Sequence, residues 1–379
     1  MNFGWALATG DLDADGTQDI VVTAPLRFNA YIFRTQNSSG TLSIGTTAVP
    51  VPHPSSNVTF GTGICVGNSD GVGADDLFIA TPTENCSVAC GGVTGTGNLL
   101  VYENASTAGV FIAPSSVSYR ISPSASLQGQ GYSLTNTEVV VRSCTLGSFD
   151  ASSPAETQLV IGSGTVSIAA GVGADVMIAF YRRTGASTFT FQNALPATAP
   201  TVTGNNWGQS VAAIQLDTGV KELLVGAPLY DNVGTDAGAV FLYTVTSSGA
   251  KFSLTDTGQA FYGGTDFDNN GAGSSIAAGD IWNHGNGVQD MVMGASLDDG
   301  TMTLGASAIN LGQAFTFRNV SGTVDPSANQ SAFSTATRGE ATRKPRTGSC
   351  HSFDRPSRGI ESSVLGIVTR KDFMPSSWR

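Results

Sequence analysis

One stretch of the chain recurs along its length, and internal repetition limits the possible folds more than any other feature. Residues 3–25 read FGWALATGDLDADGTQDIVVTAP, and residues 60–82 read FGTGICVGNSDGVGADDLFIATP, without a gap between the two copies. Further copies begin near residues 207 and 271, and a degraded copy lies between residues 131 and 164. The chain is therefore expected to be an array of similar units.

Each unit contains four short runs rich in β-branched and aromatic residues, and Gly, Pro or Asn ends each run. Such runs predict β-strands joined by tight turns. A single four-stranded sheet cannot bury both of its faces, so units in series must stack side by side, as the blades of a propeller do. The sequence therefore predicts an all-β fold, a β-propeller of four-stranded antiparallel blades with five recognisable repeats. The repeats are placed near residues 3–59, 60–130, 131–206, 207–270 and 271–331.

In the first unit the fourth strand is expected at residues 40–49, and a sixth repeat is expected to begin at Ala332. The predicted propeller domain spans residues 1–335. Beyond it the composition changes, because residues 336–379 hold nine Lys or Arg and four Asp or Glu, in a chain whose net charge is −11. This segment is expected to be a basic, disordered tail. The alternative is a departure from the repeat frame through a retained intron or a frameshift.

The loop at residues 11–19 has carboxylates at alternate positions around Gly16, a pattern that can surround one hard cation such as Ca²⁺. The EF-hand loop begins in the same way but has Glu at its twelfth position, where this chain has Val22 and enters a strand. The loop is thus predicted to join two strands, and the alternative is a solvated acidic turn. The predicted calcium ligands are Asp11, Asp13, Asp15, Asp19 and the main-chain carbonyl of Thr17.

The fifth unit repeats this loop imperfectly. His284 is aligned with Asp13 there and is expected to point away, since a hard cation prefers oxygen to imidazole. In the second unit Val72 replaces one carboxylate, and the fourth unit has a shortened loop at residues 215–222. The predicted metal ligands of the fifth unit are Asp280, Asn286 and Asp290.

Taken together, these motifs resemble the FG-GAP repeat of integrin alpha chains. The resemblance rests on Phe3-Gly4, Phe60-Gly61, the loop from Asp11 to Asp19 and the ending Gly226-Ala227-Pro228, and it covers roughly residues 1–335. It implies a calcium-binding β-propeller, usually seven-bladed in integrins, that serves in adhesion or ligand binding. Five visible repeats therefore imply either a smaller ring or an incomplete one.

Antiparallel strands place the loops of a blade alternately on two faces. The calcium loops all join first to second strands, so they share one face, while the long variable loops lie on the other. A protein ligand or partner subunit is therefore predicted on the face opposite the calcium loops, as the resemblance to integrin alpha chains also implies. Tyr230, Asp231 and Asp236 are the candidate contacts, and a plain exposed turn is the alternative.

Charge and motif content argue against several functional classes. The acidic net charge disfavours nucleic acid and anionic lipid as partners. The sequence has no run of eighteen apolar residues, so membrane insertion is not expected. It has three His and neither a nucleophile elbow nor ligands at zinc spacing, so the chain is not expected to be an enzyme. The alternative is an accessory propeller of a secreted or surface enzyme, such as a glycosylphosphatidylinositol-specific phospholipase D-like protein, whose His-rich catalytic domain is not in this sequence.

An extracellular or cell-surface glycoprotein is expected, although no signal peptide follows Met1, so the chain is interpreted as starting inside a longer protein. Five Cys suit an oxidising compartment, but free thiols are the alternative. Cys86 and Cys90 are close enough in sequence to pair, Cys65 and Cys144 pair only if neighbouring strands bring them together, and Cys350 is left over. The N-x-S/T sequons are at Asn37, Asn57, Asn85, Asn104, Asn319 and Asn329.

Overall fold

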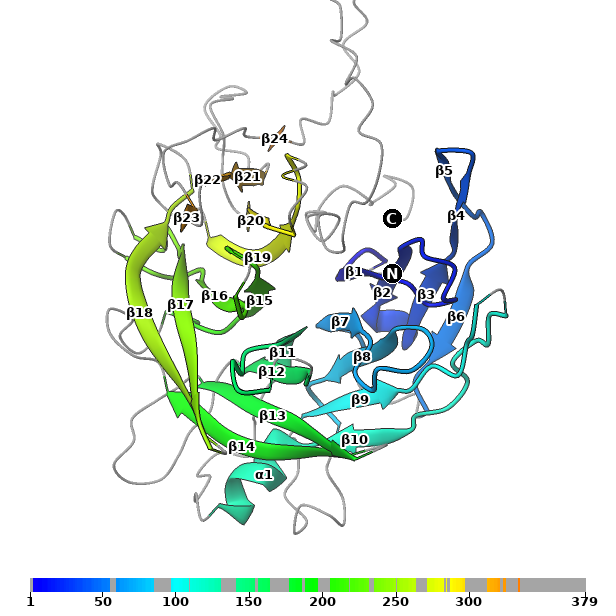
Figure 1. Ribbon diagram of the computed structural model, residues 1–379, viewed down its shortest axis with the longest axis horizontal. Helices are drawn as coiled ribbons and strands as arrows, with labels where there is room; N and C mark the ends of the chain where they lie inside the picture. The colour runs from blue at the N-terminus through cyan, green and yellow to red at the C-terminus, as the bar shows by residue number, and fades with distance from the viewer. Residues whose placement is uncertain are drawn as a thin grey trace, which may run out of the picture.

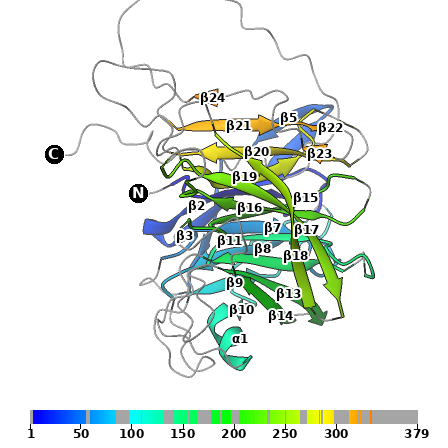
Figure 2. The ribbon, with the colours of Figure 1, turned by 90° about the vertical axis from the view of Figure 1, so that its left-hand side faces the viewer.

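Within the residues that it describes, the computed structural model contains five four-stranded antiparallel sheets that follow one another around a common axis (Figure 1), and Figure 2 shows the same sheets from the side. Each sheet is one blade, and its first strand lies innermost, so the predicted propeller of four-stranded blades is confirmed. The structure describes residues 3–54, 59–84, 97–108, 110–130, 141–153, 156–163, 177–185, 188–196, 205–217, 219–231, 235–249, 251–263, 271–282, 284, 287–296, 312–320, 323–324 and 333–334.

The first two blades use strands of three to six residues. Blade 1 contains β1 (Leu7–Gly10), β2 (Asp19–Ala24), β3 (Asn29–Phe33) and β6 (Val49–Pro52). Blade 2 contains β7 (Ile64–Gly67), β8 (Asp76–Thr81), β9 (Asn98–Tyr102) and β10 (Tyr119–Ile121).

The remaining blades have the same order of strands from the axis outwards. Blade 3 contains β11 (Val141–Gly147), β12 (Gln158–Ser163), β13 (Met177–Gly185) and β14 (Thr188–Pro196). Blade 4 contains β15 (Ser210–Ile214), β16 (Glu222–Ala227), β17 (Ala239–Ser248) and β18 (Lys251–Phe261). Blade 5 contains β19 (Ala272–Gly279), β20 (Asp290–Ala295), β21 (Gln313–Phe317) and β24 (Phe333–Ser334). The smaller elements are η1 (Pro25–Arg27), β4 (Thr35–Ser38), β5 (Thr41–Ile44), α1 (Pro123–Gly129), β22 (Asn319–Val320) and β23 (Thr323–Val324).

Two strand predictions are wrong. The outer strand of blade 1 is β6, whereas residues 41–44 pair with β4 in a separate hairpin. The sequence of β6, VPVP, contains two prolines, which an outer strand tolerates because one of its edges needs no N–H donors. Residues 333–334 pair with β21 as the fourth strand of blade 5, so they do not begin a sixth blade.

The hydrophobic core is divided among the junctions between successive blades. Separate clusters of buried side chains fill the junctions of blades 1 and 2, 2 and 3, 3 and 4, and 4 and 5. The aromatic residue that begins a repeat plugs such a junction, since Phe60 and Trp207 are fully buried against the preceding blade. No described cluster of this kind joins blades 5 and 1, and Phe3 is 49% exposed.

The glycines of the repeat lie where two blades touch most closely. A Cβ atom on Gly226 would lie 2.2 Å from the carbonyl oxygen of Gly273 in the next blade. A Cβ atom on Gly61 would similarly lie 2.7 Å from the Cβ of Thr23. A neighbouring blade therefore leaves no room for a side chain at either position, which explains the glycines of Phe60-Gly61 and Gly226-Ala227-Pro228.

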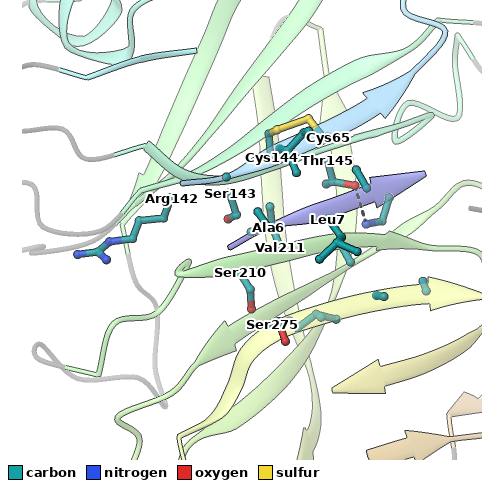
Figure 3. Close-up of a pocket in the computed structure, with 18 of the residues that line it drawn as sticks. Ala6, Leu7, Cys65, Arg142, Ser143, Cys144, Thr145, Ser210, Val211 and Ser275 are labelled. Atoms are coloured by element: carbon teal, nitrogen blue, oxygen red, sulfur yellow. Dashed lines mark hydrogen bonds between the residues drawn. A yellow bond between two sulfur atoms is a disulfide. The ribbon is translucent and has the colours of Figure 1, made fainter. Parts of the chain in front are cut away.

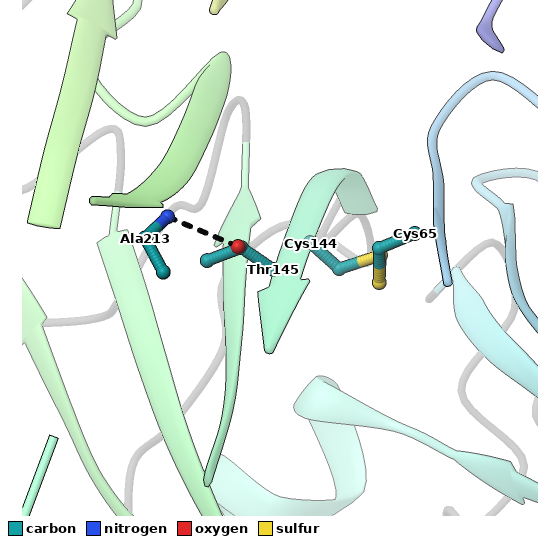
Figure 4. The surroundings of a disulfide bond; sticks show 4 residues. All are labelled: Cys65, Cys144, Thr145 and Ala213. Carbon is teal, nitrogen blue, oxygen red and sulfur yellow. Dashed lines mark hydrogen bonds between the residues drawn. A yellow bond between two sulfur atoms is a disulfide. The ribbon is translucent and has the colours of Figure 1, made fainter. Parts of the chain in front are cut away.

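A disulfide joins blades 2 and 3 at their innermost strands (Figure 4). Cys65 on β7 and Cys144 on β11 are buried, and β7 lies against β11, as the predicted pairing required. Cys86, Cys90 and Cys350 lie outside the described residues. Among the described helices, none is long and apolar enough to cross a membrane.

Candidate metal centre

The loop between β1 and β2 is folded around the carboxylate of Asp11. Its two oxygens accept the main-chain N–H groups of Asp15 and Gly16, at 3.0 and 2.9 Å, and Asp15 in turn accepts the N–H of Thr17 at 2.7 Å. Gly16 has φ +83°, so the predicted glycine turn is confirmed. These bonds draw the alternate acidic side chains toward one point.

Three of the five predicted ligands form a cluster there. Carboxylate oxygens of Asp11, Asp13 and Asp15 all lie within 4.8 Å of one another. Asp13 is fully buried, and its Oδ1 atom has no hydrogen-bond partner. Its Oδ2 atom accepts a bond from the Nε of Arg34 at 2.6 Å. A buried carboxylate oxygen without a partner is costly, and a bound cation would satisfy it, so the residues present fit a hard cation.

Asp19 is placed beside this cluster as a clasp. Its Oδ2 accepts the N–H of Leu12 at 3.1 Å and its Oδ1 accepts the N–H of Thr35 at 2.8 Å, so it ties the loop to the start of β4. Burial raises the pKa of Asp19 to about 7, and the charges of Asp13 and Asp15 add to this effect. Each oxygen of Asp19 can still accept a second partner, so a role as metal ligand remains compatible with the clasp.

The same clasp recurs in blades 2 and 5, where Asp76 and Asp290 take the place of Asp19. Asp76 accepts the N–H groups of Ser69 and Asn104, and Asp290 accepts those of Ile281 and Asn319. At this position the sequence predicted only metal binding. One sequence signal does point to the structural role, because an acid begins the second strand in four of the five units.

The fifth loop brings a histidine into its centre. Ligand atoms of Asp280, His284 and Asp290 lie within 4.8 Å of one another, and His284 Nε2 is 2.9 Å from Asp290 Oδ1. The expectation that His284 points away is therefore wrong. The main-chain N–H of His284 donates to Asp280, just as the main-chain N–H of Asp15 donates to Asp11 in the first loop. His284 therefore corresponds to Asp15 and not to Asp13. Asn286 lies outside the described residues.

The second and third loops hold an arginine against their acids. Arg183 of blade 3 reaches the second loop, where it donates to Ser69 at 2.6 Å and lies 4.0 Å from Asp70. It also donates to Glu103, which follows β9, at 2.9 Å. Arg182 bridges Asp150 and Glu156 of the third loop, with both contacts at 2.5 Å. Sequence reasoning found no cation loop in the third unit because its acids do not alternate.

Hydrogen bonds between neighbouring loops confirm that these loops share one face. Asp11 and Asp75 exchange two bonds of 2.8 Å between blades 1 and 2, and Gln215 and Gln289 exchange equivalent bonds between blades 4 and 5. On the opposite face, the N–H of Gly271 bonds the carbonyl of Asp236.

The candidate contact residues form a compact turn on that opposite face. Tyr230 packs edge-to-face on Phe241 at 5.0 Å, and burial raises the pKa of its hydroxyl. Asp231 is exposed and its Oδ1 accepts the N–H of Asp236 at 2.7 Å, while Asp236 has φ 51°. This hydrogen bond joins Asp231 and Asp236, and Asp231 is exposed at the surface.

The innermost strands of all five blades enclose a central cavity of about 250 Å³ (Figure 3). Ser143, Ser210 and Ser275 line it together with the buried disulfide, and its charged lining residues are Arg142 and Lys221. Pockets that hold drug-sized ligands usually have volumes of about 300–1,000 Å³, so this cavity is slightly smaller than such a pocket. The described lining shows no assembled catalytic group.

Comparison with known proteins supports the repeat assignment. Residues 3–44 match the family model of the FG-GAP repeat. No curated protein matches the chain. The structure is similar to a solved exotype rhamnogalacturonan lyase, YesX, at 11% sequence identity and a TM-score of 0.36. The match covers 84% of this chain but only 62% of the lyase, which is less than two thirds of its length, and likeness at this level does not bear on function.

Proposed function

We propose that this FG-GAP β-propeller is a calcium-stabilised extracellular module that binds a protein ligand or partner subunit through the face opposite its calcium loops. The observation that carries the calcium assignment is the buried, unpartnered Oδ1 of Asp13, which lies in a cluster with carboxylate oxygens of Asp11 and Asp15. An exposed acidic turn would leave each carboxylate in water, and Asp13 is fully buried.

Charge balance favours a cation in the first loop. Four carboxylates face one guanidinium, that of Arg34, so negative charge remains in a partly desolvated place. Asp11, Asp13 and Asp15 would hold Ca²⁺, with Asp19 and the Thr17 carbonyl as the further proposed ligands. A bound ion would neutralise the cluster and fasten the end of β1 to the start of β2.

The fifth loop is proposed as a second, weaker calcium site. Asp280 and Asp290 supply oxygen, but the imidazole of His284 is a poor ligand for a hard cation. Both oxygens of Asp290 accept main-chain N–H groups, as those of Asp19 do in the first loop, so the imidazole is what distinguishes the fifth loop from the first. We therefore assign the main stabilising role to the first loop.

The extracellular location is supported by covalent chemistry. The disulfide between Cys65 and Cys144 suits an oxidising compartment. Asn37 is an exposed sequon residue on the hairpin of β4 and β5, as a glycan acceptor must be. The partner is assigned to the other face because the loops proposed to hold calcium occupy this one.

The calcium assignment is tested by thermal unfolding of the full chain with calcium and with a chelator. Binding to the native state alone raises stability by about 2.7 kcal/mol when calcium is at a hundredfold excess over Kd. Asp13→Asn should remove most of the difference and leave only the smaller contribution of the fifth loop, whereas the matched variant Asp217→Asn in the fourth loop should keep all of it. Equal unfolding temperatures of the unmodified chain in calcium and chelator would refute the assignment.

The binding face is tested by displaying the full chain on cells and measuring adhesion to cells that lack it. Asp231→Lys should reduce adhesion while leaving the unfolding temperature unchanged. Asp70→Lys, which alters the loop face, should leave adhesion intact. The reverse pattern, or no adhesion in calcium, would contradict the proposed location.

A further inference from the structure

Arg34 follows the last residue of β3 and places its positive charge against one of the acids of the first loop. Its guanidinium contacts only one oxygen of Asp13, Oδ2, through Nε at 2.6 Å and also through Nη2. Its Cζ lies 5.1 Å from the ring centre of Phe111 in blade 2. The Arg34 side chain is 37% exposed, so it has room to move toward solvent.

Blade 3 shows the same pair in a completed form. Arg182 lies opposite Gln158 in the strand pairing of blade 3, and Arg34 directly follows the Ile20–Phe33 pair in blade 1. Arg182 contacts Asp150 as Arg34 contacts Asp13. The other oxygen of Asp150 accepts the hydroxyl groups of Ser247 and Ser152, at 2.6 and 2.7 Å. Burial alone would raise the pKa of Asp150, but these hydrogen bonds together hold it well below its usual range.

The difference between the two blades lies in what remains unpaired. In blade 3, arginine and serine satisfy both oxygens of Asp150. In blade 1, Asp13 Oδ1 has no partner, and the carboxylates of Asp11 and Asp15 stand beside it. The arginine, with the two serines, therefore satisfies the buried carboxylate of the third loop, whereas in the first loop the arginine alone leaves one carboxylate oxygen without a partner.

We infer that Arg34 is a built-in counter-cation that competes with calcium for Asp13 and thereby lowers the calcium affinity of the first loop. This inference rests on the proposed calcium site. In the absence of calcium, Arg34 offsets part of the repulsion among the acids. When calcium enters, it meets a positive charge on one of its own ligands, and this repulsion weakens binding. The affinity is thereby expected to fall in the range of extracellular calcium modules, with Kd roughly 0.1–1 mM.

A second role for the same contact predicts the opposite sign. By holding Oδ2, Arg34 would turn Oδ1 toward the ion, and loss of such an orienting partner typically weakens metal binding about 10–100-fold. Asp13 is fully buried, however, and its neighbours restrict it without the arginine. Charge repulsion, which acts whatever the orientation, is then the larger effect.

The test is calcium titration by calorimetry on the full chain and on two matched variants. Arg34→Gln should tighten calcium binding about tenfold, the order that Coulomb's law gives for a unit charge several ångströms from a divalent ion in water. It should also lower the unfolding temperature in chelator. Arg182→Gln removes the equivalent arginine from blade 3, so it should lower the unfolding temperature and leave calcium affinity unchanged.

Weaker or unchanged calcium binding in Arg34→Gln would overturn the inference while leaving the calcium site intact. If neither protein binds calcium, the proposed site itself fails. If Arg34→Gln binds calcium and the unmodified chain does not, Arg34 excludes calcium completely, which would support the inference. Arg34→Met replaces the charge with a long apolar side chain, and it provides the same comparison if the Gln variant does not fold.

Discussion

The side-chain amide of Asn104 donates a hydrogen bond to the main-chain carbonyl of Leu12 at 2.8 Å, although 92 residues separate them in sequence. The same amide donates to the carbonyl of Asp75 at 3.0 Å. Asn319 makes the equivalent pair of bonds, to Leu216 and Gln289. A single asparagine after the third strand thus fastens each of these blades to the loop of the blade before it.

Asn104→Ala is expected to destabilise the propeller by about 1–3 kcal/mol, the usual cost of leaving buried polar groups without partners. The carbonyl groups of Leu12 and Asp75 would both lose their donor. Chemical denaturation measures the change. Asn37→Ala, at an exposed sequon, serves as the control and should stay within about 0.5 kcal/mol of the unmodified chain. Equal effects of the two variants would show that the bonds to Leu12 and Asp75 contribute nothing.

Glycosylation should follow burial among the described sequons. Asn37 is exposed, whereas Asn104 and Asn319 are buried with both amide hydrogens engaged. When the full chain is directed into the secretory pathway, mass spectrometry should find a glycan at Asn37 and none at the two buried sites. Asn37→Gln should remove it. A glycan at Asn104 would mean that blades 1 and 2 are not assembled as described.

The buried Asn104 and Asn319 show where prediction from the sequence stopped. The spacing of the repeats gave four-stranded blades, and the alternating acids gave the cluster of Asp11, Asp13 and Asp15, because both depend on residues close together in the chain. The sequon pattern, in contrast, says nothing about where an amide points. The Arg182–Asp150 pair was missed for a similar reason, since 32 residues separate its members and only the strand register unites them.

The outer strands were also poorly predicted, for a different physical reason. The second strands of the blades are almost fully buried, so their apolar residues form continuous runs that the sequence reveals. Outer strands contact the rest of the protein less, and β6 carries two prolines while β24 is only two residues long. Their pairing is set by the neighbouring strand, and their own residues give little signal.

Glu222→Gln should stabilise the chain at pH 8 and have little effect at pH 4. Burial raises the pKa of Glu222, so the folded state binds its proton more tightly than the unfolded chain does. The resulting penalty is absent below the unfolded pKa of about 4.3 and grows as pH rises through the folded value. Gln158 holds the same place in blade 3, where its side-chain Oε1 accepts the N–H of Phe149 at 2.6 Å. A side-chain amide therefore fits at this position of a blade. Thermal unfolding from pH 4 to 8 checks this, and a gain independent of pH would contradict it.

Removal of the Cys65–Cys144 disulfide should lower stability by about 4 kcal/mol, because the two residues are 79 apart in sequence and the bond restricts the unfolded chain. The double variant Cys65→Ser, Cys144→Ser should match the reduced protein in denaturation. A reducing agent should therefore have no effect on the double variant. If reduction changed the double variant as much as the unmodified chain, another disulfide would be responsible.

The aromatic residues that begin the first two repeats should differ sharply in their contribution to stability. Phe60 is fully buried in the junction of blades 1 and 2, so Phe60→Ala should cost about 3–5 kcal/mol through lost contacts and the cavity left behind. Phe3 stands at the same place of its own repeat but is half exposed, packing on Tyr31 and Phe33 at ring distances of 5.7 and 6.2 Å. Phe3→Ala should therefore cost no more than about 1 kcal/mol, since little apolar surface returns to water. Denaturation of both variants gives the comparison, and an equally large loss for Phe3 would show that this side chain also fills a junction between blades.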